Sequence, residues 1–199
     1  RSVDHKQGIC WPVLDGHSLP NMSHGTSGIA MALARYYTLS NDDRVKRVIL
    51  GALEYDNSFW DVKESGWIDA RVSDLPNEQS STWTWCNGRS GALLSRLAIS
   101  EALNTSFMED PFVKKALKAG VNDIMKDISP GLCCGTPGLV DVLLKVSQHY
   151  PNKDIDQYVS EAVKLISLHA PKDHYSNLTP ALFTGTGGLA FSLFRASNP

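Results

Sequence analysis

Apolar residues recur at intervals of three and four positions along much of the chain, with charged residues between them. The pattern is clearest in residues 42–56, 110–128 and 154–170. Such spacing places the apolar side chains on one face of an α-helix, so each stretch is predicted to be an amphipathic helix packed against a core. Asp110 and Asp154 are predicted N-caps, and Pro111 fits a first helical turn. Strand patterns are almost absent.

A second pattern occurs four times: two residues, a glycine, two more residues, a second glycine and then an apolar run. The four copies are residues 23–35, 86–98, 133–145 and 183–195. Their first glycines are separated by 63, 47 and 50 residues, about the length of a helix pair with its loops. Because glycine permits tight turns and close backbone approach, a set of more apolar inner helices is predicted to begin at these turns. Together with the polar-faced outer helices, these inner helices predict an all-α array.

The residues just before each first glycine carry the candidate chemistry. They are Ser23-His24, Cys86-Asn87, Cys133-Cys134 and Phe183-Thr184. If the four turns lie at one end of the array, Cys86, Cys133 and Cys134 meet there. Three thiolates suit zinc, which binds sulfur and prefers four ligands, and one position would stay open for a substrate. The alternative is that these thiols are separate, buried small hydrophobic groups.

Composition narrows the class of protein. The 199 residues are 42% hydrophobic and 20% charged with a formal net charge of −2, which indicates a globular domain and no nucleic-acid partner. No apolar stretch reaches about 18 residues and the amino end lacks a signal-peptide pattern, so we expect no transmembrane segment and a cytoplasmic location. Four cysteines are few for a disulfide framework in a chain of this length.

In their order and spacing, the motifs NMSHGTSG, WTWCNGRSG, LCCGTPGL and LFTGTGGLAFSLFR resemble the lanthipeptide synthetase cyclase family, the LanC-like proteins. The adjacent Cys133 and Cys134 resemble the C-terminal cyclase domain of class II, LanM-type lanthionine synthetases. The resemblance implies an α/α toroid of inner and outer helices. Residues 1–199 would be the C-terminal portion of that toroid, with a dehydratase domain possible in the same full-length chain. Thr82 and Asn87 depart from the residues that many members carry there.

The resemblance also implies a reaction. Members of the family bind Zn²⁺ through residues that correspond to Cys86, Cys133 and Cys134. A cysteine thiol of a precursor peptide then adds to dehydroalanine or dehydrobutyrine in the same peptide, which gives a lanthionine or methyllanthionine ring. His24 corresponds to the catalytic histidine and would deliver the proton that completes the addition. The resemblance therefore implies a zinc-dependent peptide cyclase.

Three other functions remain open at this point. A LanC-like protein can bind zinc and a thiol compound such as glutathione without forming rings. A non-catalytic helical fragment can serve as a binding surface. A toroidal glycosidase would need paired carboxylates, but adjacent Asp42 and Asp43 would point to different faces of a helix.

Overall fold

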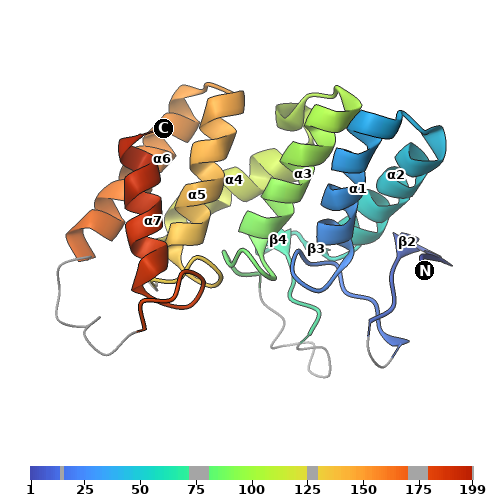
Figure 1. The fold of residues 1–199 in the computed structure, drawn as a ribbon, viewed down its shortest axis with the longest axis horizontal. Coiled ribbons are helices and arrows are strands. Elements are labelled where there is room, and N and C mark those ends of the chain that lie inside the picture. The colour runs from blue at the N-terminus through green and yellow to red at the C-terminus, as the bar shows by residue number, and fades with distance from the viewer. Residues whose placement is uncertain (14–15, 72–80, 125–129, 170–178, 199) are drawn as a thin grey trace. The chain divides into compact units, whose positions relative to one another are not determined.

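The protein is described here from a computed structural model that covers residues 1–13, 16–71, 81–124, 130–169 and 179–198 (Figure 1). Within these residues the chain is mostly helical, with seven α-helices and one short 3-10 helix. The helices are α1 (Thr26–Ser40), α2 (Asp43–Asn57), α3 (Arg89–Leu103), η2 (Phe107–Glu109), α4 (Pro111–Ile124), α5 (Thr136–His149), α6 (Lys153–His169) and α7 (Thr186–Ser197). None of the described helices is both long and apolar enough to cross a membrane.

The predicted starts of the inner helices are confirmed. Helices α1, α3, α5 and α7 each begin one residue after the first glycine of a repeat, and that glycine is the N-cap residue. A Cβ atom on Gly25, Gly88 or Gly185 would collide with the carbonyl oxygen of the residue six positions earlier. The same carbonyl accepts the next N–H of the helix, as in the 2.8 Å bond from Arg89 N to Thr82 O. Close backbone approach therefore requires glycine at these turns.

The outer helices α2, α4 and α6 lie at the predicted stretches. The Oδ1 atom of Asp110 accepts the backbone N–H of Phe112 at 2.8 Å, which confirms the N-cap of α4. The expectation for Asp154 was wrong, because α6 begins at Lys153 and Oδ1 of Asn152 accepts the N–H of Asp154 at 2.8 Å. Asparagine caps as well as aspartate does, and Asp154 lies inside the first turn, where its charge still suits the helix dipole.

The chain divides into two compact units. The first unit comprises residues 1–82 and 86–116, and the second comprises 83–85 and 117–199. In the first unit α1 packs against α2 and α3. The core cluster of these three helices is Ala30, Ala34, Ile49, Ala52 and Ile99. The small alanine side chains of α1 let the helix backbones approach closely.

In the second unit α5 packs against both α6 and α7, and its contact with α7 repeats a feature of the first unit. The hydroxyl of Ser95 on α3 donates to the carbonyl oxygen of Ser27 on α1 at 2.7 Å. The hydroxyl of Ser192 on α7 donates to the carbonyl oxygen of Pro137 on α5 at 2.9 Å. Each donor lies seven residues after the first glycine of its repeat, and each acceptor lies two residues after it. The repeats therefore share packing as well as sequence.

Two short β-ladders differ from the all-α expectation. Strands β1 (Val3–His5) and β2 (Gly8–Cys10) form one antiparallel pair, and β3 (Trp60–Asp61) and β4 (Gly66–Trp67) form the other. The second pair is stabilised by edge-to-face packing of Trp60 on Trp67, with ring centroids 4.8 Å apart. Strands of two or three residues are too short to show alternation in the sequence, so the pattern did not reveal them.

Candidate metal centre

Three cysteines come together at the glycine turns. The sulfur atoms of Cys86, Cys133 and Cys134 all lie within 4.8 Å of one another, and those of Cys133 and Cys134 are 3.4 Å apart. Within the described parts of the chain, this is the one group of three histidine, cysteine or acidic side chains placed to share a metal ion. Cys86 is buried, Cys133 is partly buried and Cys134 is exposed, so the cluster reaches the surface.

Backbone hydrogen bonds join each turn to the next. The N–H of Ser23 donates to the carbonyl oxygen of Cys86 at 3.0 Å, and the N–H of Trp85 donates to that of Cys133 at 2.8 Å. The N–H of Cys133 in turn donates to the carbonyl oxygen of Phe183 at 2.9 Å. Because Cys86 follows Trp85 directly, the bond from Trp85 brings Cys86 beside Cys133.

The cysteine cluster fits a soft divalent metal. A tetrahedral zinc ion with Zn–S bonds of about 2.3 Å separates its sulfur ligands by about 3.8 Å. The 3.4 Å pair and the 4.8 Å limit of the group bracket that separation. Helices α3 and α5 begin three residues after Cys86 and Cys133, and helix N-termini favour nearby negative charge. The residues present can therefore hold a metal ion through three thiolates.

The other predicted site residue, His24, is not part of this cluster. Its side chain is exposed on the turn before α1. The backbone N–H of the preceding Ser23 is bonded to Cys86, so the chain segment that carries His24 lies against the turn that carries Cys86. The catalytic role of His24 stays a prediction. The fourth cysteine, Cys10, is 1% exposed in β2 and lies outside the cluster.

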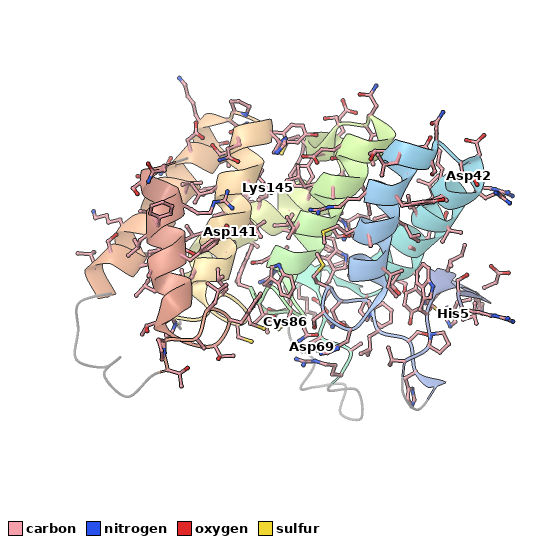
Figure 2. The ribbon with its side chains drawn as sticks, viewed as in Figure 1. His5, Asp42, Asp69, Cys86, Asp141 and Lys145 are labelled. Carbon is pink, nitrogen blue, oxygen red and sulfur yellow. The ribbon has the colours of Figure 1, made fainter. Side chains whose placement is uncertain are left out.

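A polar group that the sequence pattern did not reveal lies next to Cys86 and is formed by Asp69, Arg71 and Asn87. Nε and Nη2 of Arg71 donate to the carboxylate of Asp69 at 2.9 and 2.6 Å. Nη1 and Nη2 donate to the side-chain oxygen of Asn87 at 2.9 and 2.8 Å. Figure 2 shows Asp69 and Cys86 at the same end of α3, where the helix begins. The one signal in the sequence was Asn87 itself, a polar residue directly after a cysteine.

The aromatic residue directly before Cys86 packs against the fourth repeat. Trp85 is half-buried, and its ring packs on Phe183 with centroids 5.9 Å apart. Phe183 also supplies the carbonyl oxygen that accepts from Cys133. The fourth repeat, which has no metal-binding side chain before its glycine, thus supports the turn that carries two of the cysteines.

The sequence profile of the lanthionine synthetase C-like proteins matches residues 3–199. The chain belongs to the lanthionine synthetase C-like family. It is 25% identical over 199 residues to the lacticin 481/lactococcin biosynthesis protein LcnDR2 of Lactococcus lactis subsp. lactis. That alignment covers 89% of this chain and 20% of LcnDR2.

Among solved structures, this LanC-like chain matches nisin cyclase with a TM-score of 0.63 and 22% identity. The match covers 95% of the chain and 48% of nisin cyclase, whose fold is an α/α toroid. The likeness shows a shared helical fold. The chain therefore spans about half the length of nisin cyclase and a fifth of LcnDR2.

Proposed function

We propose that the chain is the C-terminal part of a zinc-dependent peptide cyclase that forms lanthionine or methyllanthionine rings. The observation that carries this proposal is the gathering of Cys86, Cys133 and Cys134 within 4.8 Å. Membership of the LanC-like family supports it, because the two relatives are named as a lacticin 481/lactococcin biosynthesis protein and a nisin cyclase. On this proposal the helices belong to part of an α/α toroid. A dehydratase domain in the same full-length chain and a cytoplasmic location fit the proposal.

In the proposed reaction a cysteine of the precursor peptide adds across the double bond of dehydroalanine or dehydrobutyrine. Cys86, Cys133 and Cys134 would hold a zinc ion, which would supply a Lewis acid that favours the thiolate form of the substrate cysteine. The sulfur forms a bond to Cβ while the π electrons move toward the carbonyl group of the dehydro residue. A proton is then delivered to Cα. The product is a thioether, and the net change is addition of S–H across the double bond.

His24 is the proposed donor of the proton to Cα. An imidazole exchanges protons near neutral pH, so the same side chain can take up another proton from solvent after each reaction. Its exposure gives a peptide access to the ring, and the bond from Ser23 to Cys86 keeps its turn next to a metal-binding cysteine. The partly exposed Cys133 and the exposed Cys134 place the proposed thiol-binding position at the surface as well.

One of the three alternative functions is disfavoured by a particular observation. The glycosidase hypothesis needs a free pair of carboxylates, but Asp42 is the N-cap of α2 and forms a 2.6 Å ion pair with Arg44. A zinc protein that binds a thiol compound such as glutathione would use the same three cysteines without forming a ring. A non-catalytic helical fragment that serves as a binding surface would need no metal.

A ring-closure assay distinguishes these functions. Zinc-loaded protein is incubated with a dehydrated precursor peptide, and the remaining free thiols are alkylated and counted by mass spectrometry. The cyclase proposal predicts one alkylation fewer for each ring, at a rate well above that of peptide alone. Free thiols that persist at the rate of peptide alone would refute the cyclase, and zinc-dependent binding of glutathione in the same preparation would favour the thiol-binding protein.

A further inference from the structure

The polar group Asp69, Arg71 and Asn87 is not used by the proposed reaction, although it touches the turn that carries Cys86. A guanidinium group carries only hydrogen-bond donors, so the atom of Asn87 that faces it is the amide oxygen. The amide nitrogen of Asn87 then faces the carbonyl oxygen of Cys86 at 3.2 Å and donates to it. Asn87 is 3% exposed, so its amide is held in a fixed environment.

The carbonyl oxygen of Cys86 thus accepts hydrogen bonds from two sides. The N–H of Ser23 approaches it at 3.0 Å, and the amide of Asn87 approaches it at 3.2 Å. Rotation of the peptide group after Cys86 would break both bonds. Because this peptide group adjoins the Cα atom of Cys86, fixing it also limits the direction of the cysteine side chain.

Arg71 is itself fixed by the structure that precedes it. The backbone N–H and the Nε–H of Arg71 both donate to Oδ1 of Asp69, at 3.1 and 2.9 Å. The β3–β4 hairpin that leads to Asp69 is held by the buried Arg89, whose Nε donates to the carbonyl oxygen of Ser65 at 3.2 Å and whose Nη2 donates to that of Glu64. The hairpin therefore presents Arg71 to Asn87 from a rigid base.

We propose that Arg71 is a positioning residue of the metal centre, which acts through Asn87 to hold Cys86 in the direction that binds metal. The inference rests on the proposed zinc site. Hydrogen-bonded partners of metal ligands typically change metal affinity by about 10- to 100-fold when they are removed. The guanidinium also brings a positive charge, partly offset by Asp69, to a turn where thiolates gather.

The chain contains a matched control for this residue. Arg44 pairs with Asp42 in the same local arrangement, with its backbone N–H, Nε and Nη2 donating to the carboxylate two residues earlier. That pair lies at the start of α2, and Figure 2 shows Asp42 at the opposite end of the helices from Cys86. Arg44→Met therefore removes the same kind of ion pair without touching the cysteines.

The test measures zinc affinity by competition with a chromogenic chelator, with the zinc ion as the probe and the full chain as the protein. We expect Arg71→Met and Asn87→Ala each to weaken zinc binding by about 10-fold or more, and the double variant to be no weaker than Asn87→Ala alone. Arg71→Lys, which keeps the charge but not the planar fork, should restore part of the affinity. The Co²⁺-substituted Arg71→Met protein should show altered thiolate-to-metal charge-transfer bands, and Arg44→Met should match the unsubstituted protein throughout.

The outcomes separate the inference from the proposed function. Unchanged zinc affinity in Arg71→Met, with one zinc bound in the unsubstituted protein, would overturn the inference alone. A fully additive double variant would show that Arg71 does not act through Asn87 and would overturn it as well. If the unsubstituted protein binds no zinc, the proposed function and this inference fail together. If Arg71→Met does not fold, the zinc affinities of Asn87→Ala and Arg71→Lys, measured in the same way, test the inference in its place.

Discussion

The backbone N–H of Ser23 donates to the carbonyl oxygen of Cys86 at 3.0 Å, although 63 residues separate them in sequence. Ser23 precedes the histidine proposed as proton donor, and Cys86 is a proposed metal ligand. Both lie two residues before the first glycine of their repeats. The bond therefore joins equivalent positions of two repeats and brings together two chain segments that the proposed reaction needs.

The first prediction concerns His24, which lies on the turn but outside the cysteine cluster. Replacing it with asparagine should leave zinc bound and slow ring formation about 100- to 10,000-fold, or about 3 to 5 kcal/mol of barrier, because a positioned acid is lost. The measurement is the count of free thiols over time on a dehydrated peptide, with zinc determined in the same sample. The control is His17→Asn, since His17 is also exposed and precedes α1. Ring closure at the unsubstituted rate would remove His24 from the mechanism, and loss of zinc would make it a ligand.

A second prediction concerns the buried ion pair of Arg96 and Asp56. The Nη1 atom of Arg96 lies 2.6 Å from Oδ2 of Asp56, and both side chains are 3% exposed. The guanidinium also stacks on Trp67, with Cζ 3.9 Å from the ring centroid. Arg96→Met would leave a buried carboxylate without its cation, so the free energy of unfolding should fall by about 3 to 5 kcal/mol.

Denaturant unfolding of Arg96→Met beside Arg44→Met tests this ion pair. Arg44 belongs to an exposed pair, and such pairs contribute little to stability. The Arg44 variant should therefore unfold at the same denaturant concentration as the unsubstituted protein. Equal midpoints for both variants would show that the Arg96 pair contributes no more than a surface pair does.

A third prediction concerns the pH dependence caused by Tyr55. Burial raises the pKa of Tyr55 to about 12, from an ordinary value of 10.0. Its hydroxyl donates to the carbonyl oxygen of Ser18 at 2.8 Å. The folded state thus favours the neutral phenol, so the stability that Tyr55 contributes is fully present below pH 10.0 and is lost as the pH rises toward 12. Difference absorbance of the phenolate between the unsubstituted protein and Tyr55→Phe should rise near pH 12, and a midpoint near 10 would contradict the assignment.

The sequence predicted the parts of the fold that repeat. The glycine turns place α1, α3, α5 and α7 at their observed starts, and at Gly25, Gly88 and Gly185 a Cβ atom would collide with a preceding carbonyl oxygen. The cysteine cluster followed from aligning these repeats. The N-cap of α6 was misplaced because Asn152 and Asp154 are both good capping residues two positions apart, and the pattern does not choose between them.

The rest of the site could not be predicted because it depends on how a loop returns to a turn. Arg71 and Asn87 are separated by 15 further residues, and no periodicity connects the β3–β4 hairpin to the second glycine turn. The β3–β4 hairpin is held against α3 by Arg89, which is a polar residue with no exposed surface. A sequence pattern indicates which helix face is apolar, but it does not indicate which backbone carbonyls a buried arginine will bind.

The most direct test of the account is the zinc content of single cysteine variants of the full chain, measured by metal analysis after removal of loosely bound ions. The account predicts about one zinc per chain in the unsubstituted protein and in Cys10→Ala, because Cys10 is buried in β2 away from the cluster. It predicts loss of that zinc in the Cys86→Ala, Cys133→Ala and Cys134→Ala variants. Full retention of zinc in Cys133→Ala or Cys134→Ala, or absence of zinc from the unsubstituted protein, would contradict the proposed metal centre and the cyclase built on it.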